Sequence, residues 1–150
     1  TWIIIRIDKR DEESLRILAQ NGRSKLCDLA KNVNLSISPC QSRLKKLEDK
    51  KYILGYHARV NFEQLERAHI AFVQVVLSDT RANALENFNG EVSKLESIEQ
   101  CHMIAGSFDY LLKVRTKNIS QYRTILAEKI SSLPNVASTS TFVSMETVKD

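Results

Sequence analysis

The spacing of apolar residues changes halfway along this chain of 150 residues, and that change limits the possible folds more than any other feature. Before residue 60, apolar residues recur every three or four positions in short segments separated by polar breaks, as in short helices. After residue 68, strand-like runs of branched and aromatic residues alternate with helical stripes in the order βαββαβ. We therefore predict an α+β protein in which a helical domain precedes a sheet domain.

The front part of the chain predicts three short helices. Asp8 is expected to cap a helix that runs to about Asn21, with Leu15 and Leu18 as its apolar stripe. Ser24 is expected to start a second helix. The apolar face of this second helix consists of Leu26, Leu29, Ala30 and Val33. With a third helix after them, these segments are typical of a helix-turn-helix domain.

The third helix is predicted from the segment SISPCQSRLKKLEDK, residues 36–50. Ser36 or Ser38 is expected to cap it, and Pro39 fits its first turn, where a missing N–H costs little. Its core stripe is expected to consist of Ile37, Cys40, Leu44 and Leu47. The next segment, residues 50–60, is rich in aromatic and branched residues and is predicted to form a strand or small wing.

The face of the third helix opposite the core stripe carries the side chains that we expect to bind DNA. Small hydrogen-bonding residues come first, and they can approach base edges in the major groove closely. Cations follow, and they can pair with phosphates. The candidate DNA-binding residues are Ser38, Gln41, Ser42, Arg43, Lys45 and Lys46. Because Glu48 and Asp49 lie beside the lysines, an ordinary solvated helix face is the alternative.

The charge distribution favours the DNA interpretation. Residues 1–60 hold 13 Lys and Arg against 7 Asp and Glu, a net charge of +6, whereas residues 61–150 hold 9 against 11, a net charge of −2. A basic front half joined to a slightly acidic back half is typical of a nucleic-acid module followed by a second module.

The back part of the chain predicts four strands and two helices. The strands are expected over residues 69–77, 98–106, 110–116 and 137–148, and the helical stripes run from Leu85 to Leu95 and from Tyr122 to Ile130. This order predicts an antiparallel sheet with both helices on one face. An open sheet face on a small domain commonly packs on a second copy, so we predict a dimer.

The sequence carries no recognisable motif for catalysis, metal binding or membrane insertion. The three cysteines, Cys27, Cys40 and Cys101, are odd in number and widely spaced, so we expect reduced thiols in a cytoplasmic protein. No apolar run approaches the roughly 18 residues of a membrane helix. We expect no enzyme activity, no metal site and no cofactor. Two alternatives are a small-molecule enzyme built on the sheet domain and an amino-acid-binding protein that acts without DNA.

Three segments carry a resemblance to a known family: IDKRDEESLRILAQNGR at the start, NLSISPC followed by RLKKLE in the third helix, and GSFDY between two predicted strands. With them, nearly the whole chain resembles the leucine-responsive and asparagine-responsive (Lrp/AsnC) regulators, and the back half looks closest to the leucine-responsive branch. The resemblance implies a winged helix-turn-helix DNA-binding domain over residues 1–60, a hinge over 61–67 and a ferredoxin-like βαββαβ dimerisation and effector-binding domain over 68–150. It also implies double-stranded DNA as a partner, an amino acid as effector, and assembly into dimers or octamers.

The resemblance implies an effector site between dimers, formed by the turn after the second predicted strand and by the last strand. The implied effector-binding residues are Met103, Ala105, Gly106, Ser107, Phe108, Asp109, Phe142, Val143 and Ser144. From the residues alone, Gly106 permits a positive φ in this turn, and Asp109 can either accept an amino group or tie down the hairpin. Lys51 and Glu66 stand where the family often has glycine, and Ser144 stands where an aliphatic residue would better suit leucine.

Overall fold

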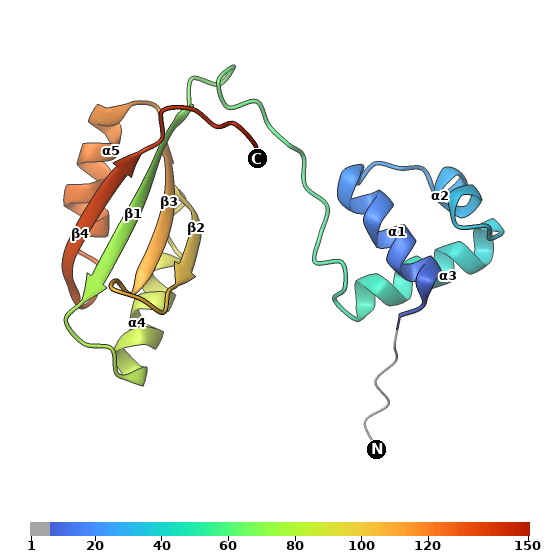
Figure 1. The fold of residues 1–150 in the computed structure, drawn as a ribbon, viewed down its shortest axis with the longest axis horizontal. Helices are drawn as coiled ribbons and strands as arrows, with labels where there is room; N and C mark the ends of the chain where they lie inside the picture. The colour runs from blue at the N-terminus through green and yellow to red at the C-terminus, as the bar shows by residue number, and fades with distance from the viewer. Residues whose placement is uncertain (1–6) are drawn as a thin grey trace. The chain divides into compact units, whose positions relative to one another are not determined.

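The structure is a computed structural model that describes residues 7–150. The chain divides into two compact units, Thr1–Arg59 and Val60–Asp150, which we refer to as the front unit and the back unit. The front unit is helical and the back unit is built on a sheet (Figure 1). The predicted α+β class, with a helical part before a sheet part, is therefore confirmed.

Three helices form the front unit: α1 (Lys9–Gln20), α2 (Leu26–Asn32) and α3 (Ile37–Asp49) (Figure 1). Asp8 caps α1 as predicted, and it does so in a reciprocal capping box with Asp11. The residue that caps α2 is Lys25, so the prediction that Ser24 starts this helix was wrong. The Ser24 hydroxyl instead donates to the Asn21 carbonyl at 2.8 Å and closes the turn between α1 and α2.

The buried apolar cluster of the front unit lies where α2 packs on α3. It consists of Leu29, Ala30, Val33 and Cys40. The predicted core stripe of α3 is confirmed at Cys40 and Leu47, which are 2% and 3% exposed, whereas Ile37 is 52% exposed and was assigned wrongly. Ile37 is the first residue of α3, so its side chain lies ahead of the part of the helix that contributes to this cluster.

α3 ends in a left-handed turn. Lys51 has a φ of 62°, and the Tyr52 N–H donates to the Leu47 carbonyl at 2.9 Å. Residues 50–60 contain no strand, so the predicted strand after α3 was wrong. A strand needs a neighbour for its backbone groups, and all the strand pairs of the described chain lie in the back unit. The lysine keeps the backbone conformation that a glycine would adopt more readily.

The back unit has the predicted βαββαβ order. Its elements are β1 (His69–Leu77), α4 (Ala82–Val92), β2 (Ile98–Met103), β3 (Tyr110–Thr116), α5 (Ile119–Ile125), the π-helical turn η1 (Leu126–Ile130) and β4 (Val136–Val143). The strands lie in the order β2-β3-β1-β4, and each neighbouring pair is antiparallel. α4 and α5 cover one face of the sheet (Figure 1). This arrangement is the ferredoxin-like fold that was predicted.

The two faces of the sheet differ in burial. Alternate residues of β1 and β3 are buried and form most of the core, together with Phe88 of α4 and Tyr122 of α5. We call the opposite face the open sheet face. On it, Phe72 and Phe142 lie directly opposite each other in the β1–β4 register and are 37% and 54% exposed. An aromatic pair of this kind on a sheet surface is a candidate contact for another chain.

Residues 61–67 form a turn that is attached to the sheet of the back unit. The Arg67 N–H donates to the Phe62 carbonyl at 2.9 Å, and the Arg115 guanidinium lies 4.1 Å from the centre of the Phe62 ring. Glu66 has a φ of 56°, so it too holds a left-handed conformation where the family often has glycine. Both of these departures from the family pattern therefore leave the local backbone in a glycine-like conformation.

Candidate nucleic-acid interface and effector site

The surface of α3 carries five of the six predicted DNA-binding side chains in exposed positions. The five are Ser38, Gln41, Ser42, Lys45 and Lys46. None of them forms a side-chain hydrogen bond or ion pair with another residue of the described range 7–150. Small polar residues come first along the helix and lysines follow one turn later, as insertion into a groove between phosphates requires.

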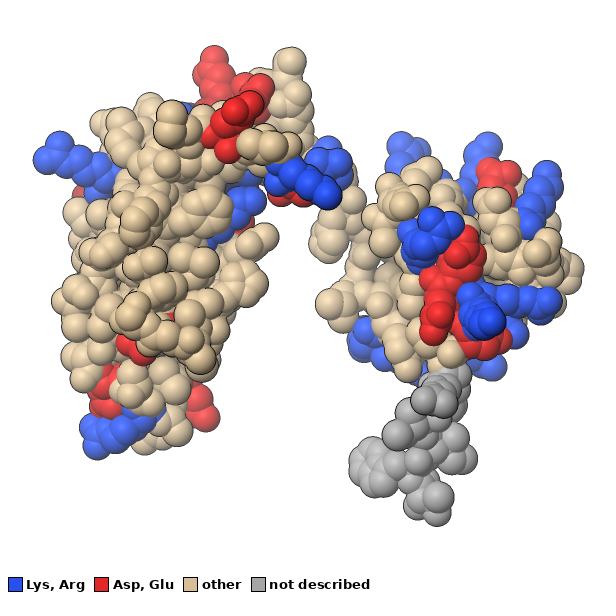
Figure 2. Space-filling view, viewed as in Figure 1, with Lys and Arg blue, Asp and Glu red and all other residues tan. Residues whose placement is uncertain are grey.

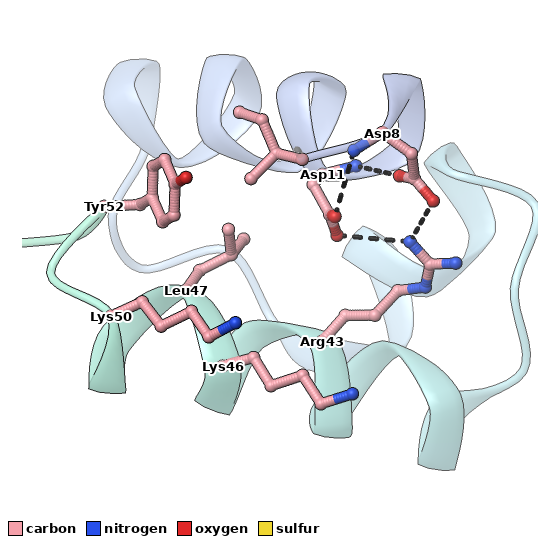
Figure 3. Close-up of a pocket in the computed structure, with 8 residues that line it drawn as sticks. Asp8, Asp11, Arg43, Lys46, Leu47, Lys50 and Tyr52 are labelled. Atoms are coloured by element: carbon pink, nitrogen blue, oxygen red, sulfur yellow. Dashed lines mark hydrogen bonds and ion pairs between the residues drawn. The ribbon is translucent and has the colours of Figure 1, made fainter. Parts of the chain in front are cut away.

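The sixth predicted residue, Arg43, is engaged inside the front unit. Its Nη1 lies 2.5 Å from Asp8 Oδ2 and 3.2 Å from Asp11 Oδ1 (Figure 3). The hydrogen bond from Arg43 is the main reason why the pKa of Asp8 lies below its ordinary value. The sequence indicated a phosphate contact for Arg43, whereas in the structure its guanidinium links α3 to the start of α1. Its partners lie 35 and 32 positions away, too far for helical periodicity to identify them.

The charged side chains are distributed differently over the two units. Lys and Arg lie around a central patch of Asp and Glu, and around a smaller acidic group near the upper edge, on the visible surface of the front unit (Figure 2). The visible face of the back unit, which is the sheet side in the same view, is mostly uncharged (Figure 2). The front unit therefore offers cations to a polyanion, and the sheet offers a largely neutral surface.

The turn between β2 and β3 is fixed by Asp109. Its Oδ2 accepts from the Leu77 N–H at 2.7 Å, and its own N–H donates to the Val75 carbonyl at 2.9 Å. These bonds support the interpretation in which Asp109 ties down the hairpin. Gly106 does not have a positive φ, so that part of the prediction was wrong. The remaining turn residues are Ala105 and Ser107, which are exposed, and Phe108, which is half-buried.

The strand register separates the two groups of predicted effector-binding residues. Met103 lies in one row of the sheet with Tyr110, Val75 and Thr139, whereas Phe142 lies three residues farther along β4. With a rise of about 3.3 Å per residue and about 4.8 Å between strands, Phe142 and Met103 are separated by roughly 10 Å along the strands and roughly 14 Å across the sheet. Val143 and Ser144 lie farther still. One chain by itself does not bring these two groups into one pocket.

The described part of the chain gives no support to metal or membrane chemistry. No helix within residues 7–150 is long and apolar enough to cross a membrane, and no group of three His, Cys, Asp or Glu side chains there could hold a metal ion. The three cysteines are free, and burial raises the pKa of the Cys40 and Cys101 thiols.

A three-helix unit with a free polar face, followed by a ferredoxin-like unit, is the architecture of a two-domain DNA-binding regulator. Residues 7–53 match the family model for a winged helix-turn-helix DNA-binding domain, and residues 70–150 match that for an Lrp/AsnC ligand binding domain. The first match ends at residue 53, so it covers only the beginning of residues 50–60, the segment in which the predicted strand is absent. The chain belongs to the Lrp/AsnC family of transcriptional regulators.

Similar proteins support the same family. The chain is 55% identical over 144 residues to a proline dehydrogenase transcriptional activator of Rhizobium radiobacter, covering 96% of this chain and 92% of the relative. It is 41% identical over 143 residues to the leucine-responsive regulatory protein of Escherichia coli, covering 95% and 87%. The crystal structure of a transcriptional regulator of Neisseria meningitidis in complex with L-Met superposes with a TM-score of 0.89 at 28% identity, covering 97% and 94%. All three of these proteins are transcriptional regulators.

Proposed function

We propose that this regulator inserts α3 into the major groove, with Ser38, Gln41 and Ser42 at base edges and Lys45 and Lys46 at phosphates. The observation that carries this proposal is that all five side chains are exposed and without a partner in residues 7–150. Side chains in this state can exchange water for base and phosphate atoms without first breaking bonds inside the protein.

The test removes both lysines and measures DNA affinity over a range of salt concentrations. Each phosphate contact contributes about 0.9 to the slope of log K against log salt, so the Lys45→Ala, Lys46→Ala double variant should flatten the slope by about two. Lys129→Ala is the control, because it removes an exposed lysine from the back unit. A double variant with the slope of the unmodified protein would refute the proposal.

We further propose that two chains pair through the open sheet face, and that such dimers can assemble further, up to octamers. The exposed Phe72–Phe142 pair on the open sheet face supports this pairing. A dimer presents two copies of α3 to two DNA half-sites, and linking them raises affinity through effective concentration.

Sedimentation tests the pairing. Phe142→Asp places a charge in the proposed contact and should yield monomers at concentrations at which the unmodified protein is dimeric. Ile119→Asp is the control, because Ile119 is 56% exposed, close to the 54% of Phe142, but lies at the start of α5. If both variants sediment like the unmodified protein, the open sheet face is not the contact.

We propose an α-amino acid as the effector. The ligand-binding match over residues 70–150 and the L-Met complex of a structural neighbour support this class. Because the two groups of effector residues lie apart in one chain, we propose that the pocket forms between chains, where the β2–β3 turn of one chain can approach the β4 end of another. Asp109 would then hold the shape of the turn.

A thermal-shift screen of the twenty amino acids tests this class, because a ligand of the folded state raises its melting temperature. L-proline comes first, since a 55% identical relative is a proline dehydrogenase activator, followed by L-methionine and L-leucine. No shift with any amino acid would exclude the class. A regulator of bacterial DNA works in the cytoplasm, and we propose that location here.

A further inference from the structure

Ion pairs between charged side chains link α3 to the beginning of α1. Arg43 contributes the cation from α3, and the first turn of α1 and its cap contribute the carboxylates of Asp8 and Asp11, at 2.5 and 3.2 Å. Figure 3 shows the guanidinium placed between the two carboxylates. Although the side chain of Arg43 is 34% exposed, that of Asp11 is only 17% exposed, so the pair lies partly out of solvent.

A cavity of about 270 Å³ lies beside this ion cluster. It is lined by Ile7, Asp8, Asp11, Arg43, Lys46, Leu47, Lys50 and Tyr52. Lys46 and Lys50 project from α3 along the same side without an ion pair in the described chain (Figure 3). The Arg43 bridge lies beside this cavity and links α3 to the start of α1, so it contributes to the spacing of the two helices at this end.

The carboxylates that hold Arg43 are themselves fixed in place. The Asp8 carboxylate accepts from the Asp11 N–H at 3.0 Å, and the Asp11 carboxylate accepts from the Asp8 N–H at 3.3 Å. This capping box locks both side chains onto the first turn of α1. Arg43 therefore binds a rigid receptor, which restricts the rotation of α3 about its own axis.

That rotation decides which side chains α3 turns toward DNA. Arg43 stands between Ser42 and Lys45 in sequence, but its side chain leaves the flank of α3 and reaches the start of α1, so it borders the proposed reading surface. We propose that Arg43 is a positioning residue: it sets the angle at which Gln41 and Ser42 meet base edges and does not itself bind phosphate. This inference rests on the proposed function of α3 and adds to it a residue that acts through its neighbours.

Asp8→Asn gives the sharpest test. Asparagine caps a helix as well as aspartate does, so the variant keeps the cap while it removes the charge that holds Arg43. Loss of a negative charge near DNA would by electrostatics alone tighten binding to every sequence. If Arg43 positions α3, affinity for the specific site should instead fall by about threefold to tenfold, with non-specific affinity unchanged or higher.

Glu12→Gln is the matched control. It removes the same charge from the first turn of α1, but the Glu12 side chain makes no hydrogen bond or ion pair within residues 7–150. Specific affinity of this variant should equal that of the unmodified protein or exceed it. If Asp8→Asn behaves like Glu12→Gln, Arg43 does not position α3 through Asp8 and the proposal fails.

Arg43→Gln separates positioning from direct phosphate binding. A positioning residue should lower the ratio of specific to non-specific affinity and leave the salt slope unchanged, whereas a phosphate ligand should flatten the slope by about 0.9. The second result would overturn the proposal. Circular dichroism shows whether Arg43→Gln folds, and if it does not, Asp8→Asn decides. Failure of the Lys45 and Lys46 test, by contrast, would reject DNA reading by α3 altogether.

Discussion

The described residues of the front unit form a smaller buried apolar cluster than those of the back unit. Among the described residues, the front cluster contains four buried side chains, whereas the back cluster contains thirteen. A small domain with a small core has little stability in reserve. The front unit therefore depends more on polar links such as the Arg43 cluster, and its outward surface stays free for a partner.

The surfaces of the two units differ in the chemical groups that they present. α3 turns hydroxyl, amide and ammonium groups outward, which suits a hydrated polyanion. The open sheet face presents the Phe72–Phe142 pair, which suits a second copy of the same sheet. This difference supports the proposals that the front unit binds DNA reversibly and that the back unit holds chains together.

The strongest test of this difference is the same core substitution in both units. Leu29 and Leu112 are 1% and 0% exposed, so leucine to alanine should cost about 2–5 kcal/mol at either site. We expect Leu29→Ala to unfold the front unit and abolish DNA binding, because the loss is comparable to the stability of a small domain. Leu112→Ala should lower the melting temperature of the back unit and leave it folded.

Calorimetry with circular dichroism measures both transitions. Leu29→Ala should retain the melting transition of the back unit. If either variant instead melted the whole chain in a single transition at the same shifted temperature, the two units would not be independent and the comparison would fail.

Removal of one tyrosine hydroxyl from each unit gives a smaller effect. Tyr110 is 2% exposed and donates to Asn89 at 2.6 Å, whereas Tyr56 is 47% exposed and donates to Glu48 at 2.8 Å. Tyr110→Phe should destabilise the back unit by about 0.5–1.5 kcal/mol in urea titration. Tyr56→Phe should cost the front unit less than about 0.5 kcal/mol. Equal losses of stability in the two variants would show that burial does not determine how much each hydrogen bond contributes.

Glycine at the two left-handed positions should stabilise each unit slightly. Lys51 and Glu66 have φ values of 62° and 56°, a conformation in which glycine is not strained. Lys51→Gly and Glu66→Gly should each raise the free energy of unfolding by about 0.5–1 kcal/mol, after the entropy that glycine adds to the unfolded chain is subtracted. Lys51→Ala keeps the strain, so an equal gain from it would point to the lysine charge instead.

The smallest effect is expected in acid, from one carboxylate in each unit. The hydrogen bond from Arg43 lowers the pKa of Asp8, and that from Arg81 lowers the pKa of Asp79 to about 2. A lowered pKa stabilises the folded state above the ordinary value of 3.8, and this stabilisation is lost as the pH falls, for Asp79 between about 4 and about 2. The Asp8 carboxylate is exposed, and the half-buried Asp79 carboxylate pairs with an exposed Arg81, so solvent screens both ion pairs and the change in stability should be small.

Carboxyl NMR titration measures these pKa values directly. The Asp79 resonance should titrate near pH 2, and Arg81→Leu should move it back toward the ordinary value. A midpoint near 3.8 in the unmodified protein would show that the Arg81 contact is not formed in solution.

Much of the fold could be predicted from sequence because neighbours in the chain decide it. The stripe Leu29, Ala30 and Val33 identified α2, and the alternation along residues 69–77 identified β1. The strand after α3 was predicted wrongly because branched and aromatic residues favour a strand only where another strand can pair with it. Ile37 was misplaced because periodicity gives its side of the helix and not how far the partner helix extends.

The residues of the candidate sites also divide into those that the sequence could identify and those that it could not. The exposed side chains Ser38, Gln41 and Ser42 followed from one amphipathic segment. The partners of Arg43 could not be predicted from this segment, because a long side chain on the flank of a helix can turn toward solvent or toward another helix. The resemblance implied a common pocket for Met103 and Phe142, and strand order separates them within one chain.

The sequence by itself determined the order of a helical unit and a sheet unit, and it determined which side of α3 is polar, because both follow from residue spacing over one or two turns. Only the tertiary structure decided that Arg43 binds Asp8 and Asp11, and that Lys51 and Glu66 hold left-handed backbones. The physical reason is that such pairings and conformations depend on which segments pack together, and residue spacing carries no information about contacts across 35 positions of the chain.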